Sequence, residues 1–177
     1  SAVSLPGGDG RPAGLELSEA AANLEGTFET FGGTAAALPG AWPRFRGADF
    51  DNIRKDGPPL ADGWGEGGPP VLWSVELGEG HAGAAVLSGR VYVLDYDEAK
   101  RADAIRCSWL ADGAEIWRHS YSVAIKRNHG LSRTVPAVTD EYVITIGPRC
   151  HTVCLKADTG DFVWGIDMVR DYGTTEP

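Results

Sequence analysis

The chain has 177 residues, of which 16 are lysine or arginine and 25 are aspartate or glutamate, so its formal net charge is −9. This acidic balance, without a basic stripe, argues against nucleic acid as a partner and against anionic membrane surfaces. No apolar run is long enough to span a bilayer, so we expect no membrane insertion within this chain. The 24 glycines and 11 prolines fit many short strands joined by turns better than long helices.

Residues 1–40 form an N-terminal arm that is rich in Ala, Gly, Leu and Glu and poor in strand formers. Its second half carries an apolar stripe with the spacing of an amphipathic helix, made of Leu17, Ala21, Leu24, Phe28 and Phe31. Ser18 can cap the start of this helix, and Gly26 can end it. We expect one short helix in a mostly irregular arm, with disorder as the open alternative. The sequence starts at Ser1, with neither an initiator Met nor a signal peptide. We therefore expect a mature product or a fragment.

Residues 41–70 form a lead-in whose Gly-Pro and Pro-Pro clusters exclude regular secondary structure. It carries four large aromatic side chains, Trp42, Phe45, Phe50 and Trp64. Exposure of all of them would create a sticky patch. We therefore expect an ordered lead-in that packs over a larger body.

From residue 71 onward the sequence is typical of β-structure. Short runs of Val, Ile, Tyr and Trp are bounded by Gly, Asp, Asn or Pro. The runs are VLWSVEL, AAVLSGRVYVLDY, DAIRCSWL, AEIWRHSY, AVTDEYVITIG, HTVCLKA and DFVWGIDMV. They predict about seven strands in roughly a hundred residues, with no convincing helix between them, so residues 71–177 are expected to be all-β.

The predicted strands repeat along the chain. When Cys107 is aligned with Cys154, CSWLADGAEIW lies over CLKADTGDFVW, and AAVLSGRVYVL lies over PAVTDEYVITI further upstream. Trp73, Trp117 and Trp164 fall 44 and 47 residues apart. A period of this length, with about four strands in it, is what a blade of a β-propeller requires. Residues 71–177 therefore predict about two four-stranded blades.

The stretch ADTGDFVW predicts a hairpin between the third and fourth strands of the second copy. Asp158 can accept backbone hydrogen bonds that start the turn, and Gly160 can adopt the positive φ that closes it. The tryptophan that follows needs a large slot, which a propeller offers between neighbouring blades. We therefore expect Trp73, Trp117 and Trp164 to dock one blade on the next.

ADTGDFVW and its degenerate copy LADGAEIW resemble the tryptophan-docking repeat of the PQQ-like propellers, which include the quinoprotein alcohol dehydrogenases. The lead-in WPRFRGADFDN and the stretch that follows it are similar to a narrower group. This group comprises the secreted PQQ-like repeat proteins of planctomycete-type bacteria, which typically open with WPxFRG. The resemblance covers residues 41–177 and implies a propeller of seven or eight blades when complete. It also implies an extracytoplasmic location, in the periplasm or at the cell surface.

Two blades alone leave raw sheet edges and an exposed inter-blade face. The chain stops at TTEP, where a third blade is expected to begin. We therefore expect the remainder of a longer polypeptide, or a protein partner, to complete the propeller.

A polar loop between the two copies is the strongest candidate for ligand binding, because such connections lie at one face of a propeller near its channel. The candidates in this loop and in the matching loop GEGHAG are His81, Lys126, Arg127, Asn128, His129 and Arg133. The cations can hold an anion, and the amide and imidazoles can supply hydrogen bonds or a metal ligand. The favoured alternative is that local hydrogen bonds order these loops and that they bind nothing.

The other polar clusters predict neither a catalytic nor a metal site. Cys150 and Cys154 lie four apart in a predicted strand, roughly 13 Å from each other, which is too far for a disulfide. Their spacing also differs from a zinc knuckle, so a buried structural thiol is the better interpretation. The acids of DYDEAKRAD do not match a calcium-binding EF-hand loop and fit a solvated turn.

Two functions follow from these patterns. The first is a non-enzymatic, extracytoplasmic propeller module that serves as a scaffold or binding platform and needs no cofactor. The alternative is the N-terminal part of a quinoprotein dehydrogenase, for which the resemblance implies PQQ and calcium. The chain lacks the adjacent cysteine pair that such enzymes often carry, which favours the first function.

Overall fold

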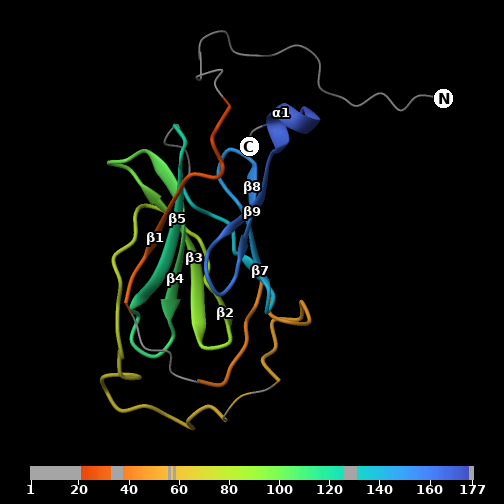
Figure 1. The fold of residues 1–177 in the computed structure, drawn as a ribbon. Helices are drawn as coiled ribbons and strands as arrows, with labels where there is room; N and C mark the ends of the chain where they lie inside the picture. Colours follow the sequence, from red (N-terminus) through yellow and green to blue (C-terminus); the bar gives the residue numbers. More distant parts are fainter. Residues whose placement is uncertain (1–20, 33–37, 56, 58, 126–130, 176–177) are drawn as a thin grey trace, which may run out of the picture.

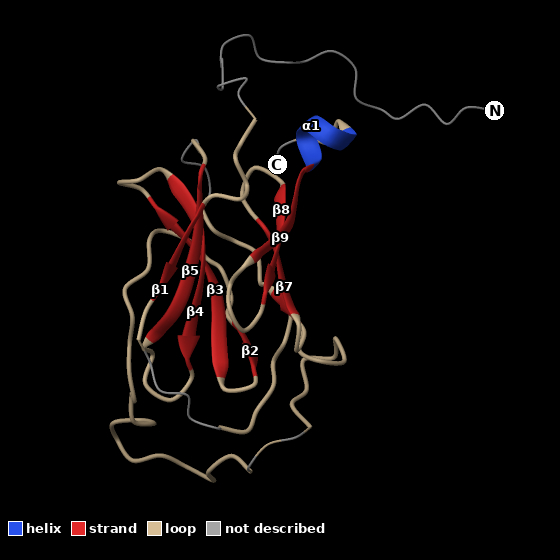
Figure 2. Cartoon of the chain, in the orientation of Figure 1, coloured by secondary structure: helices blue, strands red, loops and turns tan. Residues whose placement is uncertain are grey.

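The computed structural model describes residues 21–32, 38–55, 57, 59–125 and 131–175. Within these ranges the chain forms two antiparallel β-sheets that pack against each other, with one short helix at the end of the second sheet (Figure 1, Figure 2). The mostly β class that the sequence predicts is therefore confirmed.

The first sheet has five strands in the order β1-β5-β4-β3-β2. Their bounds are Thr27–Thr30 for β1, Ala85–Leu87 for β2, Arg90–Asp97 for β3, Ala102–Trp109 for β4 and Glu115–Ser122 for β5. The sequences of β3 and β5 alternate in burial, as strands with one covered face do. Gly113, with a φ of +73°, closes the turn between β4 and β5.

The second sheet has four strands in the order β6-β7-β8-β9. Their bounds are Ala137–Val138 for β6, Tyr142–Ile146 for β7, His151–Lys156 for β8 and Phe162–Asp167 for β9. Cys107 pairs with Trp117 in the first sheet, and Cys154 pairs with Trp164 in the second. In both sheets the register shifts directly after the cysteine. The sequence repeat is therefore a structural repeat that includes its β-bulge.

The core lies between the two sheets. Tyr92, Ile105 and Trp117 of the first sheet belong to the same buried cluster as Val153 and Leu155 of the second. Each of these side chains is at most 1% exposed. Burial of one large apolar side chain contributes about 1.5–3 kcal/mol, so the contact between the sheets is a principal source of stability.

The helix predicted in the N-terminal arm is wrong in the part that the structure describes. Phe28 lies in β1, which pairs with β5 over its whole length and gives the first sheet five strands instead of four. The unpaired donors and acceptors at the edge of β5 favour this pairing over the helical spacing of apolar residues. Gly26 adopts a φ of +55° before β1, where a Cβ would clash with the Ser120 carbonyl. Leu17 and Ser18 lie outside the described residues.

The predicted strand VLWSVEL, residues 71–77, is not a strand in the structure. A strand requires a backbone ladder to a neighbour, and none of the described strands pairs with this segment. The segment nevertheless lies along the first sheet, with Val71 84% and Leu72 82% exposed. Its apolar pattern therefore predicts a strand whose partner the described chain does not supply.

The last predicted strand, DFVWGIDMV, ends earlier than expected. Asp167 closes β9 and caps the helix α1, Met168–Tyr172, because its Oδ1 accepts a hydrogen bond from Arg170 N at 3.0 Å. Gly173, with a φ of +66°, ends the helix. Within the described ranges, no helix has the length and apolar character needed to cross a bilayer.

The lead-in, residues 41–70, contains no helix or strand in its described part, as its Gly-Pro clusters predict. An isolated bridge ties Trp42 to β2. The expected packing of the other aromatic side chains is wrong, because Phe45 is 65%, Phe50 55% and Trp64 57% exposed. The lead-in runs past the ends of the sheets, so most of its side chains do not reach the core (Figure 1).

Candidate functional site

Trp117 docks the first sheet onto the second. Its Nε1 donates a hydrogen bond to the Ala157 carbonyl at 3.3 Å, and the Tyr92 hydroxyl donates to the same carbonyl at 3.1 Å. The indole covers Gly160, where a Cβ would lie 2.6 Å from a ring carbon. Gly160 has a φ of +79°, the left-handed conformation that the repeat predicts for the close of this turn. The position of the Trp117 indole therefore requires a glycine at residue 160.

Trp73 docks on the first sheet in the same way. Its Nε1 donates to the Leu110 carbonyl at 2.9 Å, and its ring covers Gly113. Leu110 and Gly113 are the counterparts of Ala157 and Gly160, each 47 residues earlier in the sequence. Although residues 71–77 form no strand, their tryptophan occupies the place that the repeat predicts.

Trp164 is the third member of the tryptophan series, and no sheet covers it within the described chain. Its cross-strand row in the second sheet comprises Ala137, Ile144, Cys154 and Trp164. We call this surface the open row. The matching row of the first sheet comprises Ala85, Tyr92, Cys107 and Trp117, and it is buried. In the open row, by contrast, Ile144 is 36% and Trp164 39% exposed.

The side chain that hydrogen-bonds within the second turn is that of Thr159. Its hydroxyl donates to Asp161 Oδ2 at 2.7 Å and accepts from Asp161 N at 3.4 Å. In the first turn an aspartate plays the predicted part, since Asp112 Oδ1 accepts from Ala114 N at 2.9 Å. The predicted role of Asp158 as the acceptor that starts its turn stays a prediction.

Two of the predicted ligand residues lie in neighbouring loops. Gly80 and Ser132 form an isolated parallel bridge, and His81 N donates to the Ser132 carbonyl at 2.6 Å. His81 and Arg133 are both exposed at this point. The other four lie outside the described residues: Lys126, Arg127, Asn128 and His129. The ligand site predicted for these loops therefore stays a prediction.

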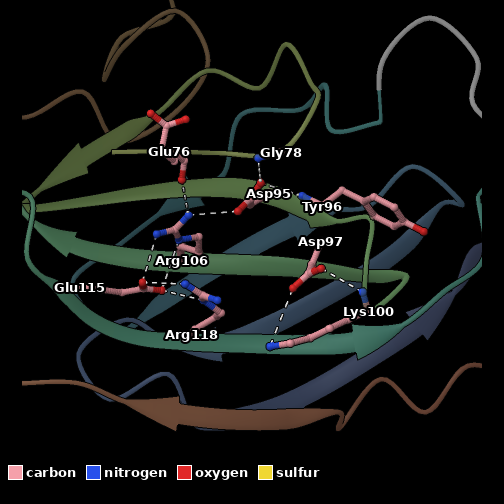
Figure 3. Close-up of polar contacts among 9 residues, drawn as sticks. All are labelled: Glu76, Gly78, Asp95, Tyr96, Asp97, Lys100, Arg106, Glu115 and Arg118. Atoms are coloured by element: carbon pink, nitrogen blue, oxygen red, sulfur yellow. Dashed lines mark hydrogen bonds and ion pairs between the residues drawn. The ribbon is translucent and has the colours of Figure 1, made fainter. Parts of the chain in front are cut away.

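A polar hollow of about 440 Å³ lies on the outward face of the first sheet, beside the β3–β4 hairpin. Figure 3 shows polar contacts of Asp95, Asp97, Lys100 and Arg118, four of the charged residues beside it. The residues that line the hollow are Gly78, Glu79, Asp95, Tyr96, Asp97, Glu98, Lys100, Ala104, Arg118 and Ser120. Its walls thus combine acidic and basic groups.

Asp95 and Arg106 hold the segment before β2 against the first sheet (Figure 3). Asp95 Oδ1 accepts from Gly78 N at 2.7 Å, and its Oδ2 accepts from Arg106 Nη1 at 3.1 Å. Arg106 Nη1 also donates to the Glu76 carbonyl at 2.9 Å. These bonds hold residues 76–78, directly after the Trp73 dock, against β3 and β4.

Glu115 completes this network from β5. It accepts from Nε and Nη2 of Arg106, at 3.2 and 3.1 Å, and from Nε and Nη2 of Arg118, both at 2.7 Å. Burial acts to raise the pKa of Glu115, but the hydrogen bonds from the two arginines outweigh it and hold the pKa below its ordinary value. The carboxylate is therefore ionised and already neutralised by the protein's own groups.

We expect Arg106→Met to destabilise the fold by about 2–3 kcal/mol, because it leaves two largely buried carboxylates without their common partner. It should also release residues 76–78, whose amides should then exchange faster with deuterated solvent. Urea unfolding and hydrogen exchange measure the two effects. Lys100→Met is the matched control, because its ion pairs are solvent-exposed and contribute less than about 1 kcal/mol. Equal losses in both variants would contradict the role of Arg106.

A second polar pair is buried between the sheets. Asp103 is 1% exposed, and its Oδ2 accepts a hydrogen bond from the Tyr121 hydroxyl at 2.7 Å. Its Oδ1 is also buried and has no hydrogen-bond partner within the described chain. Burial raises the pKa of Asp103 to about 7, although the bond from Tyr121 works against this shift. Gly147 packs on the pair, where a Cβ would lie 2.5 Å from Oδ2.

The three cysteines are free thiols. Cys150 precedes β8 and has a φ of +60°, so the predicted placement of Cys150 and Cys154 in one strand is wrong. Burial raises the pKa of Cys107 to about 12 and also raises the pKa of Cys154. Both thiols are therefore protonated and pack as small apolar groups. Among the described side chains, no three His, Cys, Asp or Glu residues gather to hold a metal ion.

Arg106 is not among the residues that the sequence pattern points to. Asp103 ends the stretch DYDEAKRAD, whose acids are predicted to lie in a solvated turn. That prediction is wrong for Asp103, which is 1% exposed, because the strand β4 has already begun and carries its side chain between the sheets. Both lie in β4, whose sequence ADAIRCSW is otherwise made mainly of buried side chains. A charged residue inside a predicted strand with apolar neighbours is the signal that points to such sites, because buried charges need partners. The partners of Arg106 come from β3, β5 and the segment before β2. Which residues become its partners depends on the register of the sheet.

Comparison with known proteins adds no family to this geometry. No protein-family model matches the chain, and no curated protein matches its sequence. The candidate site is therefore described by its own contacts: two tryptophan docks, one open row and the arginine–carboxylate network.

Proposed function

We propose that this chain is a repeat module of the β-propeller type that acts outside the cytoplasm as a scaffold or binding platform, without catalysis. The observation that supports it best is the repeated dock. Trp73 and Trp117 each donate a hydrogen bond to a backbone carbonyl of the sheet that follows them, and each indole packs over a glycine in a turn of that sheet. Docks of this kind stack successive sheets in one direction, as the blades of a propeller require. The extracytoplasmic location rests on the resemblance to secreted PQQ-like repeat proteins.

Exposed apolar groups supply the surface that a binding platform needs. Phe45, Phe50 and Trp64 of the lead-in are each more than half exposed. Exposed aromatic groups of this kind are typical of protein interfaces. We propose that the lead-in contacts a protein partner, or the remainder of the polypeptide that completes the propeller.

The polar groups support a structural role better than a catalytic one. The resemblance to quinoprotein dehydrogenases makes PQQ and calcium the cofactors to consider. Calcium requires several free oxygen ligands. Two of the carboxylates around the hollow, Asp95 and Asp97, do not fit this need. Asp95 is bound by Arg106 and two backbone N–H groups, and Asp97 is bound by the Lys100 side chain and backbone.

Native mass spectrometry of material purified from its source, before and after denaturation, tests the proposed assembly. We expect a longer polypeptide, or a fixed partner, that carries further ADxTGxxxW repeats. A folded and monomeric chain without such repeats would contradict the proposal. In a separate assay, PQQ, Ca²⁺ and a dye acceptor are added with alcohols and sugars. We expect no dye reduction, and reduction would instead establish the quinoprotein dehydrogenase.

A further inference from the structure

The described part of the N-terminal arm contacts both sheets, and we call its residues 22–31 the strap. Its strand β1 pairs with β5 from Thr27 to Thr30, and the N–H of Phe31 extends this ladder to the Ile116 carbonyl at 2.8 Å. Figure 1 shows the strap in orange along the first sheet. All four side chains of β1 are exposed, so the backbone ladder is its main attachment to this sheet.

The strap reaches the second sheet through two side chains that each fill the space beside a glycine. Leu24 is 8% exposed, and a Cβ on Gly165 would lie 2.8 Å from its side chain. The Phe28 ring lies beside Gly160, where a Cβ would come within 2.6 Å of Cε2. A side chain at either glycine would therefore collide with the strap.

His119 of β5 contacts the strap and is 1% exposed. Its Nε2 lies 3.0 Å from the Leu24 carbonyl, and its ring stacks on Phe162 of β9 with the ring centroids 6.1 Å apart. The carbonyl can only accept a hydrogen bond, so Nε2 is the donor in this pair. The strap is therefore held by a backbone ladder, one polar contact and two apolar contacts, which come from both sheets.

The turn before β1 gives the strap a specific sequence requirement. Gly26 has a φ of +55°, and a Cβ there would collide with the Ser120 carbonyl. This turn lies between Leu24, which contacts the second sheet, and Thr27, which begins the ladder to β5. Residues 24–28 thus meet the two sheets with the pattern Leu-x-Gly-x-Phe.

The strap is an addition to the structural repeat. The second sheet consists of four strands, and within the described chain no fifth strand pairs with β9. The first sheet contains the same four strands, β2 to β5, in the same order. Segments with few buried contacts open locally while the rest of the fold persists. Release of the strap should therefore leave the two sheets folded.

We propose that β5, β9 and the turn before β9 form a binding site for an extended segment of the pattern Leu-x-Gly-x-Phe. The strap occupies this site in its own chain and can leave it. The backbone ladder to a strand edge provides affinity, and the side-chain contacts provide specificity, as in proteins that bind a peptide as an added strand. A segment with the same pattern in another protein is the kind of partner that replaces the strap. This inference goes beyond the proposed architecture, because it rests only on the contacts of the strap.

The test releases the strap in the full chain and reads the accessibility of His119. Gly26→Val places a branched side chain against the Ser120 carbonyl at a positive φ, so the strap no longer fits. Modification of each histidine by diethylpyrocarbonate is measured by peptide mass spectrometry. We expect His119 to react several-fold faster than in the native chain. His151, which is 4% exposed, should stay protected and report that the sheets remain folded.

Gly32→Val is the matched control, because a Cβ at Gly32 would meet no described atom within 4 Å apart from its chain neighbours. This variant should leave His119 as protected as in the native chain. If Gly26→Val does not fold, Leu24→Ala removes the buried side chain of the strap instead and is read in the same way.

The second step supplies the strap as a separate molecule. A synthetic peptide of residues 21–32 is added to the Gly26→Val chain, and the same peptide with Gly26→Val serves as its control. We expect the first peptide to return the reactivity of His119 toward that of the native chain as the peptide concentration rises. The substituted peptide should have no effect, because it meets the same Ser120 carbonyl.

Three outcomes overturn the inference. The first is that His119 stays protected in the released variants. The second is that His119 and His151 become reactive together, or that neither variant folds, because the strap is then a part of the core. The third is that the peptide of residues 21–32 gives no protection, or that protection of His119 in the native chain falls on dilution, which would assign the strap to a second copy. None of these outcomes bears on the assembly measured by native mass spectrometry.

Discussion

Trp117→Ala is expected to destabilise the chain by about 3–5 kcal/mol, as truncation of a large buried aromatic side chain does. Trp117 is 1% exposed, and its loss leaves a cavity between the sheets and an unpaired Ala157 carbonyl on the side of the indole. The same substitution at Trp164 should cost less, about 1–2 kcal/mol, because this side chain is 39% exposed and lacks a covering sheet. Urea unfolding followed by circular dichroism measures both values.

Trp164→Ala is a strict control for Trp117→Ala, because the two residues occupy the same register position opposite Cys154 and Cys107. Equal losses at the two positions would show that docking does not distinguish them. If Trp117→Ala does not fold, Trp117→Phe keeps the test open. Phenylalanine retains most of the apolar contact but cannot donate the indole hydrogen bond. The lost hydrogen bond should lower the free energy of unfolding by about 1 kcal/mol, in addition to the effect of the smaller buried area.

Asp103→Asn is expected to change the pH dependence of stability strongly. Burial raises the pKa of Asp103 from 3.8 to about 7 in the folded chain. Its contribution to stability is therefore fully present below about pH 4 and is lost as the pH rises to about 7. The shift corresponds to a loss on the order of 4 kcal/mol over this range. Asparagine has no charge to bury, so the variant should lack this loss.

The measurement is the free energy of unfolding of both proteins between pH 4 and pH 8. As the pH rises across this range, the free energy of unfolding of Asp103→Asn should increase relative to that of the native chain. The other titratable groups are present in both proteins, including His151, whose ring centroid lies 5.5 Å from that of Tyr121. Tyr121→Phe provides a second check. It removes the bond that lowers the pKa of Asp103, so the decline should extend to higher pH. Parallel curves for Asp103→Asn and the native chain would refute the assignment.

The repeat could be predicted because its signal is local. Cys107 and Cys154 each stand a fixed distance before a glycine turn and a tryptophan, and the two sheets share their register and their bulge. Hairpin pairing depends on residues that lie close together in the sequence, so alignment of the two copies also aligns their strands. The same reasoning placed Gly160 at the positive φ of its turn.

Elements that depend on distant partners could not be predicted in this way. The spacing of Leu24 and Phe28 fits a helix, yet the edge of β5 pairs with this segment, and the Leu24 carbonyl lies 3.0 Å from His119 Nε2. Residues 71–77 have the composition of a strand but lack a neighbour to pair with. The partners of Arg106 and Asp103 come from other strands, so the alternation of β4 alone does not reveal them.

The sequence by itself determined the mostly β class, the two-fold repeat, the glycine turns and the residues that dock one sheet on the next, because strand periodicity and turn chemistry act over a few residues. Only the tertiary structure decided that β1 joins the first sheet, that Trp73 docks without a strand and that Asp103 is buried. It also decided which tryptophans are covered and which one remains open. Burial and backbone pairing depend on which surfaces meet, and that is a property of the whole packed chain.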